Sequence, residues 1–400
     1  MDKDEFEINK KAVFNKIEKS FKNKNTFDSP FKADSETLSV TIIPTTDCNL
    51  RCSYCYADGG FDKKKLDFES AKIFLDKLIS TNLNCTKINL YFAGGGEPLL
   101  NIELIKKLVD YVKNKGLKPT IRIVTNGTLV PNHIKWLKDN KVYLRISFDG
   151  SAQKVNRQSP YFNSAEKVEN TFQILKKNYP IELLSTQMTI TKENVNKMAE
   201  DVEKIILNYK IDAIKIESVH TSFSNRSKKV QQPTPKELVI NYLKTLDNLV
   251  KKNIKGYIDL SYLSIPSTSY FCSLRNKAVL SPYNVITPCV EIIQKGIKDE
   301  WILCDDLSMI NFDQMRETQK KELYKYHPSS YNLCTQCNLV HICKKNCPMR
   351  TILSENAEKY PFNCAVSKQL IPEFLKRAIE NKKYMELVFG ESYQEGITCD

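Results

Sequence analysis

Residues 38–55 read LSVTIIPTTDCNLRCSYC, an apolar and β-branched run that leads directly into three cysteines. The run Leu38–Pro44 predicts a buried strand, because strands covered on both faces are rich in such residues. Cys48, Cys52 and Cys55 follow it with the spacing C-x3-C-x2-C. Three thiolates within one short loop can converge on a single soft metal centre. This stretch therefore predicts a strand that ends at a metal-binding loop.

Strands and helices are predicted to alternate over the first half of the chain. Further apolar, β-branched runs lie at 88–93, 120–125, 142–148, 183–190 and 213–216. The segments with helical periodicity between them lie at 67–79, 102–115, 131–138, 164–177 and 195–207. This alternation is typical of α/β folds with a parallel sheet or barrel. Six such units are two short of a closed eight-stranded barrel, so we predict a partial (β/α)6 TIM-like barrel with ligands at the C-terminal ends of its strands.

The second half of the chain has a different composition. The alternation stops after about residue 220, and cysteines gather between residues 270 and 364. Small regions that bury little apolar area often fold around metal. The predicted division is an N-terminal polar and helical extension (1–37), the barrel (38–235), a linker helix and strand (236–269), a small irregular cysteine-rich domain (270–367), and a C-terminal helix and tail (368–400).

Composition limits the compartment and the partners. No stretch approaches the 18 apolar residues of a membrane span, and the N-terminus lacks the apolar core of a signal peptide, so we expect a cytoplasmic protein without a membrane partner. In that reducing compartment the thirteen cysteines are expected to serve metal or redox chemistry rather than disulfides. The net charge of +13 would suit nucleic acid or an acidic peptide, but the lysines are scattered without a basic tract. We therefore interpret them as a solvated surface and expect no nucleic-acid partner.

The cysteine loop indicates a function when it is considered together with a glycine-rich loop. Gly94-Gly95-Gly96-Glu97-Pro98 follows the second predicted strand, and together with Cys48–Cys55 it resembles the radical S-adenosylmethionine (SAM) superfamily. The resemblance implies a [4Fe–4S] cluster on three cysteines, with SAM on the remaining iron. It also implies reductive cleavage of SAM to a 5′-deoxyadenosyl radical that abstracts a substrate hydrogen. Zinc is the alternative for the loop, although a closed zinc site requires four ligands.

The resemblance also implies a set of SAM contacts. Gly95, Gly96 and Glu97 would hold the methionyl amino group, and Tyr54 would lie near the adenine unless it faces the core. Ser147-Phe148-Asp149-Gly150 resembles the family's S-x-D-G element, whose serine contacts SAM. Relatives often place a carboxylate-binding arginine twelve residues after that serine, where this chain has Ser159, so Arg157 is the predicted substitute. The predicted cofactor-binding residues are Tyr54, Gly95, Gly96, Glu97, Asn126, Ser147 and Arg157. The sequence leaves the catalytic residues unassigned.

A second group of cysteines resembles the SPASM domain. Its members are Cys272, Cys289, Cys334, Cys337, Cys343, Cys347 and Cys364. Asn284 stands where that domain has a glycine, and asparagine is the residue other than glycine that best tolerates a left-handed turn. By spacing alone, a zinc ribbon or knuckle fits the run from Cys334 to Cys347 equally well.

The SPASM resemblance implies two auxiliary [4Fe–4S] clusters. The ligands of the first would be Cys272, Cys289 and Cys347, and those of the second Cys334, Cys337, Cys343 and Cys364. The first cluster lacks an evident fourth cysteine. Either Cys304 completes it, or the site is open to a substrate thiolate.

SPASM-bearing radical SAM enzymes mostly modify peptides and proteins. The resemblance implies a maturase that forms a thioether or carbon–carbon crosslink in a ribosomally made precursor peptide. It would use SAM and three [4Fe–4S] clusters, and an electron donor such as flavodoxin or ferredoxin. Only 37 residues precede the first strand, so we expect the peptide leader to be recognised in another way or by a separate leader-binding protein.

Two other functions remain open at this stage. Sulfatase-maturating (formylglycine-forming) enzymes place a general-base aspartate directly after the second SPASM cysteine. Here Val290 stands after Cys289, and Glu291 is one step further along. The alternative of another class is a non-catalytic iron–sulfur electron carrier or a zinc-stabilised binding module, for which the glycine-rich loop beside the three cysteines would have no purpose.

Overall fold

A computed structural model describes residues 36–220, 230–263, 278–296, 299–325 and 362–390, with shorter pieces between 327 and 348 and three residues near the N-terminus. Its sheet has the strand order β7-β6-β5-β4-β3-β2-β1-β8-β9. The parallel strands are β1 (Thr37–Ile42), β2 (Lys87–Phe92), β3 (Lys118–Thr125), β4 (Tyr143–Ser147), β5 (Leu184–Ile190), β6 (Ala213–Ser218) and β7 (Tyr257–Leu260). Two short strands, β8 (Val279–Leu280) and β9 (Ile286–Thr287), extend the sheet beyond β1.

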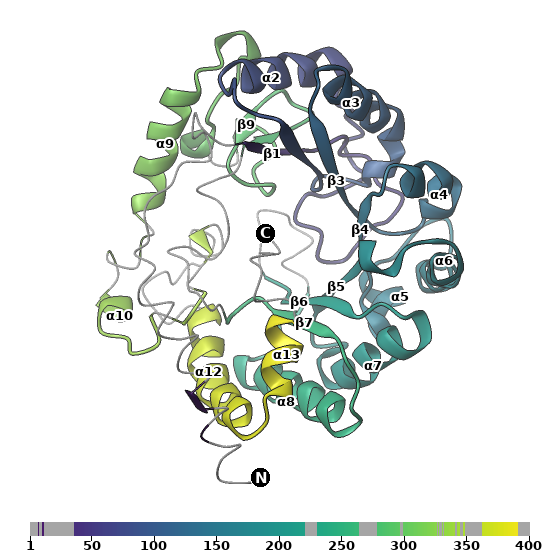
Figure 1. Ribbon diagram of the computed structural model, residues 1–400, viewed down its shortest axis with the longest axis vertical. Coiled ribbons are helices and arrows are strands. Elements are labelled where there is room, and N and C mark those ends of the chain that lie inside the picture. Colours follow the sequence, from purple (N-terminus) through teal and green to yellow (C-terminus); the bar gives the residue numbers. More distant parts are fainter. Residues whose placement is uncertain are drawn as a thin grey trace.

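Helices follow most of the parallel strands and lie on the outside of the curved sheet (Figure 1). These helices are α2 (Phe68–Ser80), α3 (Ile102–Asn114), α4 (Val130–Asp139), α5 (Gln153–Asn156), α6 (Ser164–Asn178), α7 (Met198–Tyr209) and α8 (Pro235–Lys251). The predicted α/β partial barrel is therefore confirmed. The structure differs from the six predicted units in one respect: the short strand β7, which follows α8, pairs in parallel with β6 and forms a seventh strand.

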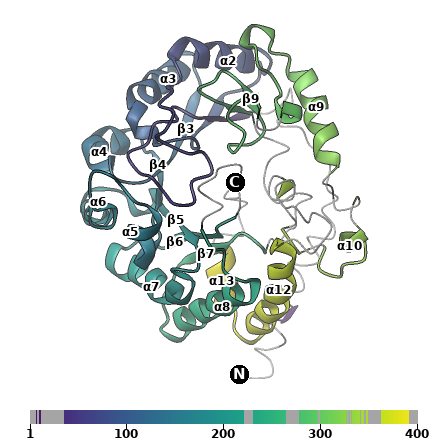
Figure 2. The same ribbon diagram turned by 180° about the vertical axis from the view of Figure 1, so that it is seen from behind.

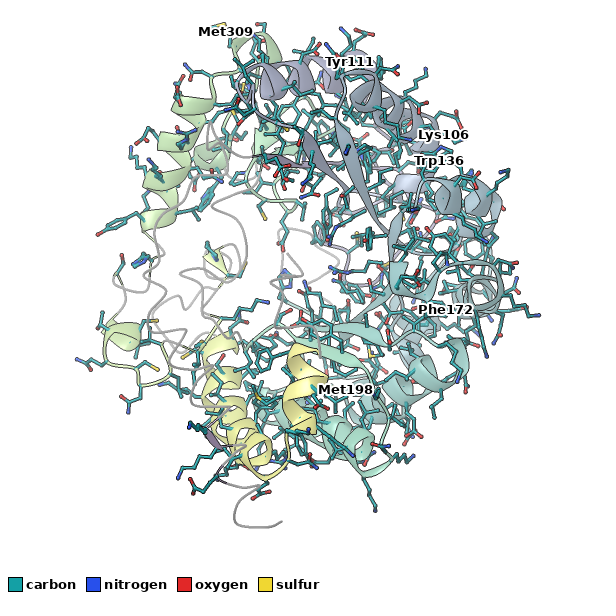
Figure 3. The ribbon with its side chains drawn as sticks, in the orientation of Figure 1. Lys106, Tyr111, Trp136, Phe172, Met198 and Met309 are labelled. Carbon is teal, nitrogen blue, oxygen red and sulfur yellow. The ribbon has the colours of Figure 1, made fainter. Side chains whose placement is uncertain are left out.

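Burial alternates along the strands and gives the sheet two different faces. In β4, Leu144 and Ile146 are buried beneath the helices, whereas Arg145 and Ser147 on the opposite face are partly exposed. Phe172 of α6 is fully buried in the same outer layer and is labelled in Figure 3. Closed eight-stranded barrels fill their interior with branched aliphatic side chains. The inner face of this sheet carries polar residues instead, which suits a ligand rather than a packed core.

The C-terminal elements cover the two ends of the sheet. They are α9 (Phe312–Tyr324), α10 (Asn332–Thr335), α12 (Phe362–Glu380) and α13 (Lys383–Phe389). The ring of Phe312 in α9 packs 6.4 Å from that of Phe74 in α2. Arg377 of α12 pairs with Asp247 of α8 at 2.9 Å, and both views place α9 and α12 beside opposite ends of the sheet (Figures 1 and 2). The chain after β9 thus spans from one end of the sheet to the other.

Local sequence signals explain where several helices begin. Thr234 and Glu237 form a reciprocal capping box at the start of α8, and Pro235 occupies its first turn as expected. Asp67 caps α2 by accepting a hydrogen bond from the backbone N–H of Ser70. Within the described ranges, no helix is long and apolar enough to cross a bilayer. Cys272 and almost all of the predicted extension 1–37 lie outside the described residues.

Candidate active site

The three-cysteine loop begins after β1, and hydrogen-bond donors surround its sulfur atoms. The backbone N–H of Leu50 donates to Cys48 Sγ at 3.4 Å, and that of Gly59 donates to Cys55 Sγ at 3.3 Å. The Nδ2 atom of Asn126, at the end of β3, lies 3.9 Å from Cys48 Sγ. Such donors stabilise sulfur that carries negative charge.

Electrostatics at Cys48 fit a metal cluster. Burial raises the pKa of the Cys48 thiol well above its usual range, and the neighbouring Cys52 and Glu97 raise it further. A thiol in this position becomes a stable thiolate when a metal binds, because a bound cation deprotonates it outright. Cys48, Cys52 and Cys55 are all partly exposed and free of disulfides, so the donor set suits an iron–sulfur cluster.

Arg51 fixes the shape of this loop. Its Nη1 donates to the carbonyl of Cys48 at 2.5 Å, and its Nη2 donates to the carbonyl of Gly60 at 2.7 Å. Its backbone N–H donates to the carbonyl of Gln158, in the segment after β4, at 2.6 Å. Sequence reasoning missed Arg51, although its place between Cys48 and Cys52 was a usable signal. These hydrogen bonds therefore tie the loop to Gly60 and to the segment after β4.

The glycine-rich loop after β2 lies directly against the chain that leads to Cys48. The backbone N–H of Gly96 donates to the carbonyl of Thr45, and that of Glu97 to the carbonyl of Asp47, both at 2.8 Å. A Cβ atom on Gly96 would stand 1.9 Å from the Asp47 carbonyl oxygen. Only glycine permits this approach, so the predicted residues Gly95 and Gly96 are brought beside the cysteine loop.

Glu97 is buried and fully engaged by the protein. Its carboxylate accepts hydrogen bonds from Thr125 Oγ1 at 2.6 Å, from the Asn126 N–H at 2.8 Å and from the Leu99 N–H at 3.1 Å. Burial raises its pKa to about 6, against the effect of these donors. Glu97 thereby ties the end of β2 to the end of β3 and positions Asn126. Its contact with the methionyl amino group stays a prediction.

Tyr54 and Arg157 converge on Asp149. The Tyr54 hydroxyl donates to Asp149 Oδ2 at 2.5 Å, and Arg157 Nε lies 3.1 Å from Asp149 Oδ1. The Arg157 guanidinium also stands over the Tyr54 ring, 5.3 Å from its centroid. Asp149 is fully buried, and its role as a common partner was missed, although the S-x-D-G element contains it. Ser147 lies at the end of β4 on the inner face. The SAM contacts expected of Tyr54, Ser147 and Arg157 stay predictions.

The C-terminal cysteine region packs against both of these loops. Val290 belongs to a small apolar cluster with Ile43, and its Cβ would lie 3.1 Å from a Cβ added to Gly94. Burial raises the pKa of Tyr56 well above its usual range, and the negative charges of Glu291, Cys55 and Cys289 add to this effect. The charges that act on Tyr56 therefore come from both cysteine regions.

The four cysteines predicted for the second auxiliary cluster influence one another. Burial raises the pKa of Cys364 to about 11, and the neighbouring Cys343, Cys334 and Cys337 also raise it. No three His, Cys, Asp or Glu side chains of the described residues are close enough to hold a single metal ion. The thiolates of a cluster bind different iron atoms, so they stand further apart than ligands of one ion.

Two details of the SPASM resemblance can be located. Asn284 has a φ of 58°, which confirms the left-handed turn expected where the family has glycine. Cys304 Sγ donates to the carbonyl of Asp306 at 3.1 Å, and burial raises its pKa. Its backbone pairs with that of Ile286 in β9, close in sequence to Cys289. Whether Cys304 or an open position completes the first auxiliary set stays a prediction.

Comparisons with known proteins agree with this arrangement. Residues 42–205 match the model of the Radical SAM superfamily, which confirms the predicted radical SAM domain. The radical SAM cyclopropyl synthase TigE of Paramaledivibacter caminithermalis is 25% identical over 222 residues, which cover 50% of this chain and 46% of TigE. An uncharacterized protein of Methanocaldococcus jannaschii is 34% identical over 40% of this chain and 56% of its own length. The chain thus spans about half the length of these two relatives.

Two solved structures share the fold. The structure of anSMEcpe with bound AdoMet and the Kp18Cys peptide has a TM-score of 0.67 at 19% identity and covers 86% of this chain and 98% of its own. Streptococcus suis SuiB bound to its precursor peptide SuiA has a TM-score of 0.55 at 14% identity and covers 82% of this chain and 75% of its own.

Proposed function

With a radical SAM domain at residues 42–205 as the premise, we propose that this protein is a radical SAM/SPASM peptide maturase. It abstracts a hydrogen from a ribosomally made peptide and forms a thioether or carbon–carbon crosslink. A [4Fe–4S] cluster held by Cys48, Cys52 and Cys55, together with SAM, would supply the radical chemistry. Two auxiliary clusters would be held by the seven SPASM-type cysteines.

An apolar cluster shared by the two cysteine regions carries this proposal. Ala57, two residues after Cys55, and Val290, directly after Cys289, both pack against Ile43, Val279 and Ile293, so the auxiliary region adjoins the loop where the substrate radical would form. A crosslink removes two electrons from the peptide, one with the abstracted hydrogen atom and one more as the new bond forms. The auxiliary cluster that the SPASM-type cysteines would hold could accept the second electron, and the second hydrogen would leave as a proton.

The partners follow from the same reasoning. SuiB binds the precursor peptide SuiA, and anSMEcpe binds the Kp18Cys peptide, which supports a peptide substrate here. Curated relatives also include GTP 3′,8-cyclases, so a small-molecule substrate is the outcome that would contradict us. We propose flavodoxin or ferredoxin as the electron donor and the cytoplasm as the compartment, where thiols stay reduced.

The first test replaces the three-cysteine loop. Anaerobically reconstituted protein is expected to hold about twelve irons, as three four-iron clusters. Changing Cys48, Cys52 and Cys55 together to Ala should remove about four irons and all 5′-deoxyadenosine formation. Iron analysis and chromatography measure these quantities. Cys85→Ala is the matched control, since the Cys85 thiol donates to the Lys87 carbonyl and belongs to neither motif. A triple variant that still cleaves SAM would contradict the assignment.

The substrate class needs a separate measurement. Candidate precursor peptides are incubated with the reduced protein and SAM, and their mass is followed. A crosslinked peptide is lighter by two hydrogens. When the peptide carries deuterium at the attacked position, that deuterium should appear in 5′-deoxyadenosine. Turnover of a nucleotide without any peptide modification would replace our proposal with a small-molecule function.

Sulfatase-type maturation is the second candidate, and one contact favours it. Glu291 Oε1 lies 3.0 Å from His220 Nε2 just beyond the end of β6, so this carboxylate is held near Tyr56. Val290, which stands where sulfatase-maturating enzymes have the aspartate, has no group that accepts a proton, and its side chain packs against Gly94. In a crosslinking maturase, Glu291→Gln should retain product formation. A loss on the order of 10²-fold or more would support a general base at Glu291. His220→Gln is the control, because it removes the pair between His220 and Glu291 but keeps the Glu291 carboxylate.

A further inference from the structure

The inner face of the sheet carries charges of both signs. Arg122 stands on β3, Arg145 on β4, Lys215 and Glu217 on β6, and Asp259 on β7. Each alternates with buried neighbours that face the helices, so all of these side chains belong to the concave side. They lie below the strand ends at which the cysteine and glycine-rich loops meet.

Most of these cations already have a partner. Lys215 Nζ lies 3.0 Å from Glu217 Oε1. Burial lowers the pKa of Lys215, but Glu217 and Asp259 outweigh this effect, and the pKa is raised. The Arg122 guanidinium stands over two tyrosine rings, 5.9 Å from the centroid of Tyr91 and 5.1 Å from that of Tyr143. These contacts compensate their charges.

Arg145 differs from both. Its Nε atom is buried without a hydrogen-bond partner, and no carboxylate among the described residues pairs with its guanidinium. Its neighbours in register are Val124 on β3 and Ser185 on β5, neither of which carries charge. The like charge of Lys215 lies close enough to interact with it, because Arg145 acts to lower the pKa of Lys215. A partly buried cation in this position costs stability, because it loses water without gaining an anion.

We propose that Arg145, with Lys215 beside it, is a subsite that binds a carboxylate of the substrate peptide. This proposal rests on the proposed function for the identity of the substrate. A planar guanidinium matches a carboxylate by two parallel hydrogen bonds, which Lys215 alone would not provide. Arg145 precedes Ser147 by two residues on the same face of β4, so the bound carboxylate would lie about 7 Å below the predicted SAM contact. An acidic residue near the attacked position would thereby fix the register of the peptide.

The first experiment asks whether Arg145 is held ready for a ligand or supports the fold. Melting temperatures are measured on anaerobically reconstituted full-length protein without peptide. Arg145→Met should melt about 1–3 °C higher than the wild type, because it removes an uncompensated charge. Arg122→Met is the matched control from the same face, and it should melt lower because its two aromatic contacts are lost. An Arg145→Met variant that melts lower than the wild type would make Arg145 structural and would overturn the proposal.

The second experiment measures the ligand at constant ionic strength. N-acetylglutamate α-amide should raise the melting temperature of the wild type, whereas the neutral N-acetylglutamine amide should not. The increase should disappear in Arg145→Met and persist in Arg122→Met. Absence of any increase, an equal increase in Arg145→Met, or stabilisation by inorganic phosphate alone would each overturn the proposal. So would a tenfold loss of SAM affinity in Arg145→Met, since the anion would then be the carboxylate of SAM.

None of these measurements requires turnover. If no peptide is modified but the carboxylate still stabilises the protein through Arg145, the proposed function fails and the subsite stands. If crosslinking occurs but the carboxylate still raises the melting temperature of Arg145→Met, the function stands and the subsite fails.

Discussion

The two cysteine regions of this molecule are built in different ways. The loop from Cys48 to Cys55 is fixed by the barrel, because Arg51 binds its carbonyls and the glycine-rich loop packs against the chain that enters it. The later cysteines rest on much smaller elements. Cys343 forms an isolated bridge with Leu263, and the Cys337 N–H closes a turn onto the Cys334 carbonyl.

This difference indicates two sources of stability. The first loop follows β1, whose buried side chains belong to a continuous apolar core that includes Ile42, Phe92 and Ile123. Burial of that core stabilises the strands that carry the loop. Of the described residues between 327 and 348, only Ile342 and Cys347 are buried hydrophobic side chains, so bonds to metal should contribute directly to the folding of this part.

Removal of iron should have the largest effect and should separate the two regions. Anaerobic chelation is expected to speed amide exchange at Val340 and Cys343 by about 10²-fold or more, because their turns then lose their metal anchors. Exchange at Gly96 and Asn126 should change by less than about threefold. Hydrogen exchange read by mass spectrometry measures both. Equal acceleration in the two regions would contradict the comparison.

Glu97→Gln tests the barrel side of the comparison. A glutamine offers only one acceptor atom, so the N–H of Asn126 or Leu99 would face an amide NH2 group. The expected cost is about 1–3 kcal/mol of unfolding free energy, because a buried donor is left unsatisfied. Denaturant unfolding gives the value, and Thr125→Ser, which keeps the hydroxyl that donates to Glu97 and accepts from the Gly127 N–H, should cost less. A neutral Glu97→Gln would mean that the network does not hold the strand ends together.

Asn284 tests the C-terminal side and should have the smallest effect. Asn284→Ala is expected to cost about 1–2 kcal/mol, because alanine is strained at a φ of 58°. Asn284→Gly should stay within about 0.5 kcal/mol of the wild type. Both values come from denaturant unfolding of the iron-loaded protein. Similar costs for alanine and glycine would show that the Asn284 side chain, rather than its backbone conformation, matters.

Much of the fold was readable from the sequence. The period of apolar residues predicted the parallel barrel, since burial on both faces of a strand leaves a direct mark on composition. A strand was also predicted within residues 236–269, but the four residues Tyr257–Leu260 carry too little pattern to indicate that it pairs with β6 as a seventh strand of the sheet. The cysteine spacings and the left-handed position of Asn284 were also readable, because both are properties of a short stretch of chain.

Partner choice inside the site required the tertiary structure. The sequence around Glu97 does not indicate that Thr125 donates a hydrogen bond to it. The sequence around Asp149 does not indicate its hydrogen bond with Tyr54, which lies 95 residues away in the chain. Arg122 and Arg145 are the same residue type on the same face of the sheet, yet Arg122 stands over two aromatic rings and Arg145 has no carboxylate partner among the described residues. Spacing along the chain determines which residue types a loop can offer. The register of strands and the packing of distant loops decide which of them meet, because those contacts form only when the whole sheet closes around them.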